Sequence, residues 1–126
     1  MLVVMNKKVL IIDDEADIRF LLKRALISHN YTVVEAENLK SGLELYNSTE
    51  PDIIILDVNL PDGNGIYYAK KFKNDKNVVI FISADNDKLA AGYREVGANG
   101  FLKKPFVVEQ LLDVIKKVQT NTPNIN

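Results

Sequence analysis

The sequence predicts an α/β domain built on an open parallel sheet with helices on both faces. Two observations support this fold class. First, five short apolar runs alternate with five segments of helical spacing; the runs are VLII (9–12), TVVEA (32–36), DIIIL (52–56), VVIFIS (78–83) and GFLK (100–103). Second, the first, third and fourth runs are nearly continuous in Ile, Val and Leu, a pattern typical of parallel strands covered on both faces. Right-handed crossovers then place the intervening helices on both sides of the sheet.

The intervening segments carry apolar residues at helical spacing. They cover residues 16–29, 38–48, 65–73, 87–96 and 107–118. In the first of them, Leu22 and Leu26 belong to one apolar stripe, which predicts an amphipathic helix. Gly97 follows the fourth segment, where a glycine often ends a helix. Because the second and fifth apolar runs are weaker, we expect those two strands nearer the edges of the sheet.

Length and composition favour a single domain and exclude several kinds of protein. A chain of 126 residues is long enough for one core. Its 16 basic and 17 acidic residues leave a net charge of −1, so the chain lacks the excess positive charge typical of proteins that bind nucleic acid or an anionic membrane. The absence of cysteine excludes disulfides and cysteine catalysis. No apolar run approaches the roughly 20 residues of a membrane span, so we expect a cytoplasmic protein.

Polar side chains follow four of the predicted strands at the point where each strand ends. Asp13 and Asp14 follow the first strand, Asp57 the third, and Lys104 the fifth, while Ser83 ends the fourth. Ligands bind to open α/β sheets beyond the carboxyl ends of the strands. We therefore expect three carboxylates, a hydroxyl and an ammonium group to meet at one edge of the sheet.

Such a cluster needs something to offset its charge. Two unit charges about 4 Å apart repel by about 4 kcal/mol at an effective dielectric of about 20. Either some carboxylates hold a proton or a cation binds, and an all-oxygen site of this kind suits Mg²⁺. Together with Lys104 and Ser83, the site also suits phosphoryl transfer, which needs positive charge and donors around the phosphoryl oxygens. Asp57 is the best nucleophile, because Asp13 and Asp14 are adjacent and can hold the metal.

Taken in order, these motifs resemble the receiver domain of two-component response regulators. The resemblance rests on DDE (13–15), LDVNLPDGNG (56–65), SA (83–84) and KPF (104–106). It covers about residues 7–118, and 119–126 would be a polar tail or the start of a linker. It implies a flavodoxin-like (βα)5 three-layer sandwich with a parallel sheet of order 2-1-3-4-5. It also implies a phosphoacceptor switch that catalyses only its own phosphorylation and autodephosphorylation.

The resemblance implies a metal-dependent phosphoacceptor. Asp57 would accept a phosphoryl group from a histidine kinase or a phosphotransfer protein. Asp14 and Asp57 would bind Mg²⁺ (or Mn²⁺) directly with the backbone carbonyl of Asn59, and Asp13 would act through water. Asn59 and Asp85 would tune dephosphorylation, and because both are polar we expect a short-lived phosphoryl group.

The resemblance also implies a switch. Ser83 and Ala84 would contact the phosphoryl group with Lys104, and Ser83 would supply the switch hydroxyl. Phe101 would be the aromatic switch, and Pro105 would follow a cis peptide bond. Two of these residues differ from the commonest ones in the family, where Thr often stands at the position of Ser83 and Tyr at that of Phe101.

The resemblance further implies that the partners dock at two surfaces. The kinase would dock around the first helix and the loop after the fifth strand, including Phe106. An output partner, or an output domain beyond the C-terminus, would use the face formed by the fourth helix, the fifth strand and the fifth helix. A phosphorylation-dependent homodimer is consistent with the sequence, while direct nucleic-acid or membrane binding by these residues is not.

Several of these residues also have simpler interpretations. Asp13 and Asp14 can cap the first helix, and Ser83 the fourth. Asp57 precedes a segment rich in turn residues, and Phe101 can be an ordinary core residue. Neighbouring residues on a strand face opposite ways, so only one of the two lysines at 103 and 104 can point into the site.

Three other kinds of protein remain as alternatives. A flavodoxin-like electron carrier would cradle a phosphate in its first loop, but DDE would repel it. An aspartate-nucleophile phosphatase would place a second acid two residues after the nucleophile and carry a cap domain. A degenerate receiver acting only as a binding module would lack one of the key residues, and this sequence keeps them all.

Overall fold

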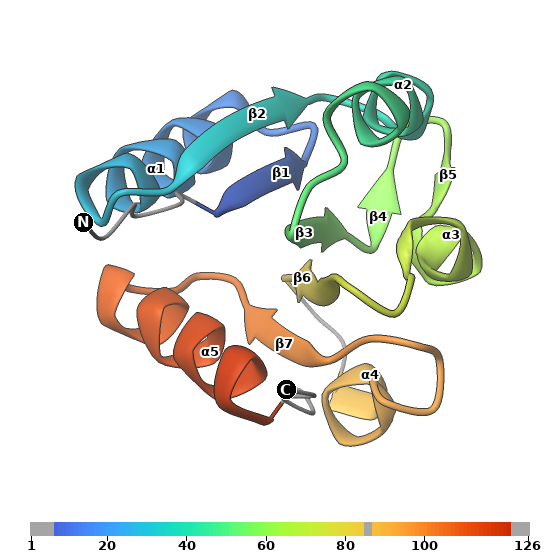
Figure 1. Cartoon of the computed structure of the whole chain (residues 1–126). Helices are drawn as coiled ribbons and strands as arrows, with labels where there is room; N and C mark the ends of the chain where they lie inside the picture. Colours follow the sequence, from blue (N-terminus) through green and yellow to red (C-terminus); the bar gives the residue numbers. More distant parts are fainter. Residues whose placement is uncertain (1–6, 85–86, 122–126) are drawn as a thin grey trace.

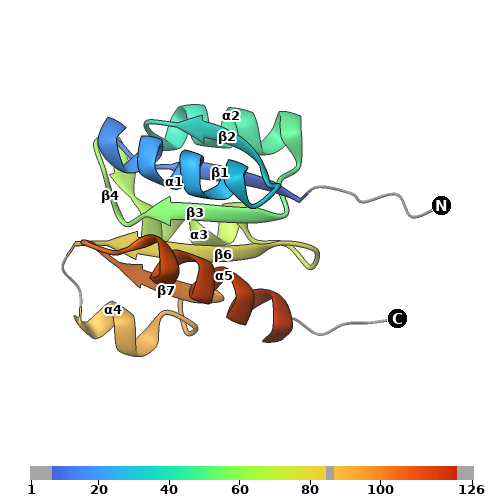
Figure 2. The same ribbon diagram turned by 90° about the vertical axis from the view of Figure 1, so that its left-hand side faces the viewer.

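The structure, a computed structural model, describes residues 7–84 and 87–121. Its main sheet has five parallel strands in the order β2-β1-β3-β6-β7. The strands are β1 Lys8–Ile12, β2 Thr32–Ala36, β3 Ile53–Asp57, β6 Val78–Ser83 and β7 Gly100–Lys103. Because β4 and β5 lie outside this sheet, the order is the predicted 2-1-3-4-5. The predicted flavodoxin-like fold is confirmed, and Figure 2 shows the strands running in the same direction.

The helices cover both faces of the sheet (Figure 1). One face carries α1 Ala16–Ser28 and α5 Val108–Asn121, and the other carries α2 Leu39–Thr49, α3 Gly65–Phe72 and α4 Asp87–Gly92. The described part of the chain holds no helix long and apolar enough to cross a membrane. The three layers explain why the central strands read as continuous apolar runs: both of their faces are covered.

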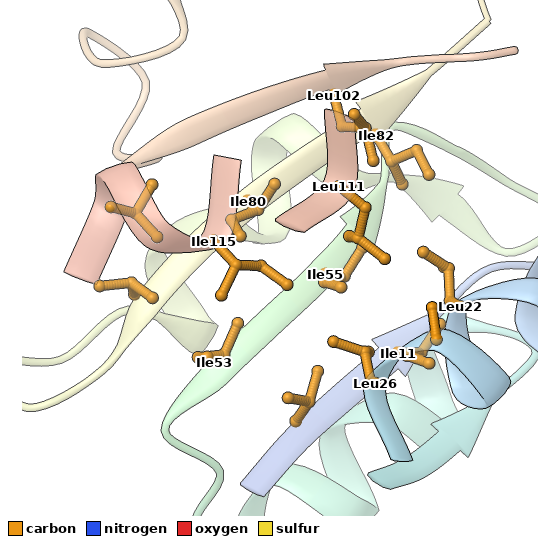
Figure 3. Close-up of a cluster of buried hydrophobic side chains, with 14 of the residues drawn as sticks. Ile11, Leu22, Leu26, Ile53, Ile55, Ile80, Ile82, Leu102, Leu111 and Ile115 are labelled. Carbon is orange, nitrogen blue, oxygen red and sulfur yellow. The ribbon is translucent and has the colours of Figure 1, made fainter. Parts of the chain in front are cut away.

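Each face of the sheet has its own apolar cluster. Val9 and Ile11 point toward α1 and α5, whereas Leu10 and Ile12 point toward α2 and α3, because successive side chains of a strand face opposite ways. Figure 3 shows the first cluster, in which Leu22 of α1 approaches the sheet. The central strands β3 and β6 are buried along their whole length, and the edge strand β2 is largely half-buried. This distribution is the predicted one.

The fourth helix is shorter than the sequence predicts. It ends at Gly92 rather than at residue 96, since glycine is a poor helix former, and turns follow. The Ala98 N–H donates to the Tyr93 carbonyl at 3.1 Å, and the Gly97 N–H donates to the Arg94 carbonyl at 3.2 Å. These bonds and the φ of +99° at Gly97 form a glycine-terminated Schellman arrangement. Gly97 therefore closes the turns that follow α4, whereas the helix itself ends at Gly92 and not before Gly97 as predicted.

Two further features differ from the sequence prediction. Helix α5 continues to Asn121, into residues expected to form the tail. A small antiparallel hairpin, β4 Asn59–Leu60 and β5 Gly63–Asn64, follows β3. Strands of two residues leave no readable periodicity, so only the turn residues of this segment were visible in the sequence.

The hairpin returns the chain to the end of β3, where α3 begins at Gly65. The Gly65 N–H donates to the Val58 carbonyl at 2.8 Å. A side chain at this position would collide with the carbonyl oxygen of Asp57 and lie 3.1 Å from the Val58 Cα. Both of these are backbone atoms, which cannot move aside as a flexible side chain can. The start of α3 therefore requires glycine.

We expect Gly65→Ala to lower the free energy of unfolding by about 1–3 kcal/mol because of this backbone collision. Gly92→Ala is the matched control: the nearest atom to its new methyl group is the Glu95 Oε2 at 3.8 Å. That variant should be unchanged or more stable by about 0.5–1 kcal/mol. Urea unfolding measures both. Equal stability of Gly65→Ala and the wild type would show that the close approach is not a constraint.

Candidate functional site

The carboxyl ends of the strands bring the predicted acidic residues together. Asp13 follows β1 and Asp57 ends β3, and their exposed fractions are 0% and 4%. Asp14, between β1 and α1, is exposed. One carboxylate oxygen from each of these three residues lies within 4.8 Å of the other two. The expected meeting of three carboxylates at one edge of the sheet is therefore present.

Lys104 supplies the positive charge at the centre of this cluster. Its Nζ lies 2.8 Å from Asp13 Oδ2, 3.2 Å from Asp57 Oδ2 and 3.4 Å from Glu15 Oε1, and the residue is only 7% exposed. The contact with Asp13 is an ion pair outside hydrogen-bond geometry, so Asp13 Oδ2 accepts no hydrogen bond from the described residues. Lys103 is exposed, and Lys104 is the lysine that enters the site.

Burial and neighbouring charges shift the pKa values of Asp57 and Lys104. Burial raises the pKa of Asp57 to about 6, and repulsion from Asp13 acts in the same direction. The Asn59 N–H, 3.0 Å from Asp57 Oδ1, and the Lys104 ammonium oppose that rise. Burial disfavours the charged form of Lys104, but Asp13 and Asp57 more than offset it and raise its pKa. At neutral pH the site therefore holds an ammonium group beside an ionised Asp57.

The loop that carries the first two aspartates is held by α1 and β2. The Glu15 N–H donates to Asp13 Oδ1 at 2.8 Å, and Arg19 Nη1 donates to the Asp13 carbonyl at 2.8 Å. Arg19 Nε also bonds Glu35 Oε1 at 3.0 Å. The N-cap position of α1 belongs to Glu15, whose side chain makes no capping bond. The simpler interpretation of Asp13 and Asp14 as N-cap residues of α1 is therefore wrong.

The remaining predicted residues line the ends of β6 and β7. Ser83 ends β6, is fully buried, and accepts a backbone hydrogen bond from the Lys104 N–H at 2.8 Å. Ala84 follows and is exposed, while Asp85 lies outside the described residues. The Lys104–Pro105 peptide bond is cis, the form expected there.

Phe101 and Phe106 lie in different surroundings. Phe101 is half-buried on β7, and its ring stacks on Tyr93 with centroids 6.5 Å apart. Phe106, expected on the docking surface, is 9% exposed and belongs to the core between α1, α5 and the sheet. That expectation is wrong for Phe106. The next residue, Val107, is 56% exposed and faces solvent in its place.

Two contacts at and beside this site are not predicted from the sequence. Glu15 reaches Lys104, and only its place directly after Asp14 hinted at that contact. Asp62, at the tip of the β4–β5 hairpin, binds the first turn of α2 through Leu39 and Lys40. The sequence marks Asp62 as a turn residue but carries no signal for a partner 23 residues earlier.

The donor set suits a hard divalent cation. The cluster offers only oxygen atoms, which Mg²⁺ and Mn²⁺ prefer. The buried Asp13 Oδ2 has an ion-pair partner but no hydrogen bond among the described residues. One ammonium group also leaves several carboxylates uncompensated. Asp13, Asp14 and Asp57 could therefore hold such an ion.

The raised pKa of Asp57 predicts that the free energy of unfolding depends on pH. Its folded-state pKa is about 6 against an ordinary value of 3.8, so the folded protein binds this proton more tightly than the unfolded chain does. The stabilisation from this proton is complete below pH 3.8 and is lost as the pH rises through about 6. Without divalent cations at pH 7.5, Asp57→Asn should therefore be more stable than the wild type by about 1–3 kcal/mol.

This advantage should shrink near pH 5, where the wild type carries a protonated and neutral Asp57. Urea unfolding in a metal chelator at both pH values measures the difference. Asp113→Asn, on the exposed side of α5, controls for removal of a carboxylate and should show no such pH dependence. An advantage of Asp57→Asn that grows toward low pH would contradict the assignment.

Comparison with known proteins identifies the family. The model of the response regulator receiver domain family matches residues 9–116. The KDP operon transcriptional regulatory protein KdpE of Escherichia coli is 39% identical over 107 residues, which are 82% of this chain and 47% of KdpE. Sporulation initiation phosphotransferase F of Bacillus subtilis is 32% identical over 116 residues, which are 90% of this chain and 94% of that protein.

A solved structure agrees in fold. The chemotaxis response regulator CheY4 of Vibrio cholerae superposes with a TM-score of 0.81 at 28% identity, over 90% of this chain and 99% of CheY4. The chain thus spans about half the length of KdpE and nearly the full length of phosphotransferase F and CheY4. The chain belongs to the response regulator receiver domain family of two-component signal transduction, whose known function is to be phosphorylated on an aspartate.

Proposed function

We propose that Asp57 is the phosphoacceptor of this receiver domain and that a histidine kinase or a phosphotransfer protein supplies the phosphoryl group. One observation carries the assignment. The carboxylate of Asp57 is buried at the end of the central strand β3, within 3.2 Å of the Lys104 ammonium and close to two further aspartates. An ionised carboxylate is costly in such a place, and nucleophilic use of the group gives a reason for it.

The transfer needs an ionised Asp57. A carboxylate oxygen forms a bond to phosphorus, the bond from phosphorus to the donor atom breaks, and the donor leaves with that electron pair and takes up a proton. A pKa of about 6 keeps Asp57 ionised at neutral pH. Lys104 is placed to compensate charge on the phosphoryl oxygens. A divalent cation held by Asp13, Asp14, Asp57 and the Asn59 carbonyl would supply further positive charge there.

Phosphorylation then changes the partners of Lys104. The new group adds close to two negative charges at the end of β3, which draw Lys104 away from Asp13. Ser83 and Ala84, at the end of β6, move toward the phosphoryl oxygens. Phe101, half-buried against Tyr93, turns inward as Ser83 moves. The face formed by α4, β7 and α5 changes shape and controls the output.

Two surfaces suit two kinds of partner. Exposed apolar side chains on α1 (Phe20, Leu21 and Ile27) and Val107 after β7 form the surface for the kinase or phosphotransfer protein. The α4–β7–α5 face serves a separate output protein, an output domain beyond residues 119–126, or a second phosphorylated copy. The regulatory relatives that are about twice as long support an output domain. We propose that the receiver runs from residue 7 to the end of α5 at Asn121, three residues beyond the bound expected from the sequence, and that the protein lies in the cytoplasm.

Autodephosphorylation reverses the switch. Water attacks phosphorus, the bond to the Asp57 oxygen breaks, and inorganic phosphate leaves. Asn59 is exposed beside Asp57 and can orient that water, as can Asp85. We expect Asn59→Ala and Asp85→Ala each to lengthen the lifetime of the phosphoryl group several-fold, measured by intact mass after removal of the donor. Asn47→Ala, exposed on α2, should leave it unchanged. Unchanged lifetimes in both variants would refute this role.

The assignment of Asp57 is tested directly by intact mass after incubation with acetyl phosphate. We expect the wild type to gain one phosphoryl group with Mg²⁺ and none in a chelator. Asp57→Asn should gain none because it lacks the nucleophile, whereas Asp113→Asn should behave like the wild type. Equal labelling of Asp57→Asn would refute the assignment. No labelling of the wild type, where another receiver is labelled, would indicate a phosphorylation-independent binding module.

A further inference from the structure

The β4–β5 hairpin lies directly beside Asp57 but has little stability of its own. Each of its strands has two residues, and Pro61 and Asp62 connect them. Such a short hairpin is at best marginal in isolation. Its first residue, Asn59, donates its N–H to Asp57 Oδ1 at 3.0 Å. The position of this peptide relative to Asp57 therefore depends on contacts between the hairpin and the rest of the fold.

The tip of the hairpin is tied to α2 by Asp62. Asp62 Oδ1 accepts a hydrogen bond from the Leu39 N–H at 2.8 Å, and Oδ2 accepts one from the Lys40 N–H at 3.0 Å. Both oxygens are thus used by the first turn of a helix, where a negative charge is also favoured. These bonds outweigh the effect of burial and lower the pKa of Asp62, so the carboxylate stays ionised over the physiological range.

The other contacts hold the base and the side of the hairpin. Leu60 is buried in the cluster between the sheet and α2 and α3, and the Gly65 N–H bonds the Val58 carbonyl. Gly63 lies so close to α2 that a Cβ there would come within 2.8 Å of Leu39 Cδ1. The two Asp62 bonds join backbone N–H groups to an ionised carboxylate. Such charge-assisted hydrogen bonds are directional, whereas the apolar contacts of Leu60 and Gly63 are not.

We propose that Asp62 is a positioning residue for the Asp57 site. By anchoring the hairpin to α2, it holds the Asn59 peptide in place against the Asp57 carboxylate. The inference rests on the proposed function, in which the Asn59 carbonyl and Asp57 share a divalent cation. Loss of the anchor loosens one ligand of that cation without removing any group from the site.

The chain offers a matched control for the second role of Asp62 as a helix cap. The N-cap residue of α2 is Asn38, whose Oδ1 accepts a hydrogen bond from the Ser41 N–H at 2.8 Å. Asn38→Ala therefore weakens the same end of α2, while the bonds from the Leu39 and Lys40 N–H groups to Asp62 remain. Asp62→Ala removes both the cap and the anchor. Asp62→Asn keeps one acceptor oxygen and serves as the conservative variant.

The test measures Mg²⁺ binding by calorimetry and the free energy of unfolding by urea for the wild type and these three variants. We expect both alanine variants to lose similar stability. Only Asp62→Ala should raise the Kd for Mg²⁺, by about tenfold, as outer contacts of a metal site commonly do. Asp62→Asn should fall between it and the wild type. Phosphorylation of Asp62→Ala by acetyl phosphate should approach the wild-type rate at saturating Mg²⁺.

The outcomes separate the two levels of the proposal. Equal Mg²⁺ affinity of Asp62→Ala and Asn38→Ala, in a chain whose wild type binds Mg²⁺ and is phosphorylated, would overturn the positioning role alone and leave Asp62 as a helix cap. A wild type that binds no Mg²⁺ would overturn the proposed function and this inference with it. A selective loss of Mg²⁺ affinity in Asp62→Ala supports both.

Discussion

The enclosure of one ammonium group by carboxylates at the end of the sheet is the interaction on which the rest of the site depends. Lys104 touches Asp13, Glu15 and Asp57, and the two aspartates are almost completely buried. The apolar strands β1 and β3 are covered on both faces, so Asp13 and Asp57 at their carboxyl ends lie in a poorly solvated space. Loss of Lys104 would leave the buried charges of Asp13 and Asp57 uncompensated, which is far costlier than loss of a surface pair. The shortage of positive charge makes the cluster receptive to a cation, while burial, assisted by repulsion from Asp13, raises the pKa of Asp57.

Most of the fold could be predicted from the sequence because its signals are local. Continuous apolar runs mark the central strands, and polar residues immediately after them mark the edge where the site forms. Contacts between distant segments leave no such signal: Asp62 binds Leu39 across 23 residues. Two glycines, Gly92 and Gly97, could each end the fourth helix, and the sequence does not show which one does. When two apolar residues are adjacent in a loop, the sequence likewise does not show which of the two is buried. The sequence therefore does not distinguish the buried Phe106 from the exposed Val107.

The two loops that carry the acidic residues are held from outside the site by polar contacts of the same kind. Arg19 of α1 bonds the Asp13 carbonyl and reaches Glu35 of β2, while Asp62 bonds the first turn of α2. Arg19 bonds the Asp13 backbone and the Glu35 carboxylate, and Asp62 bonds backbone N–H groups, so neither contact consumes a group that the chemistry needs. Arg19 and Asp62 thus hold the backbone around the site, while the carboxylates themselves contact Lys104 and the N–H groups of Glu15 and Asn59.

The alternation of side chains along β7 has a consequence for signalling. Phe101 packs with the cluster beneath α2, α3 and α4, whereas its neighbour Leu102 packs with the cluster beneath α1 and α5. In the proposed switch, a rearrangement of the Phe101 ring would therefore act first on the side of the sheet that α4 covers. A protein bound to the exposed side chains of α1 would meet nearly the same surface in both states. The sheet thus separates the Phe101 ring from α1, whereas the proposed output face extends over both sides of the sheet through α4 and α5.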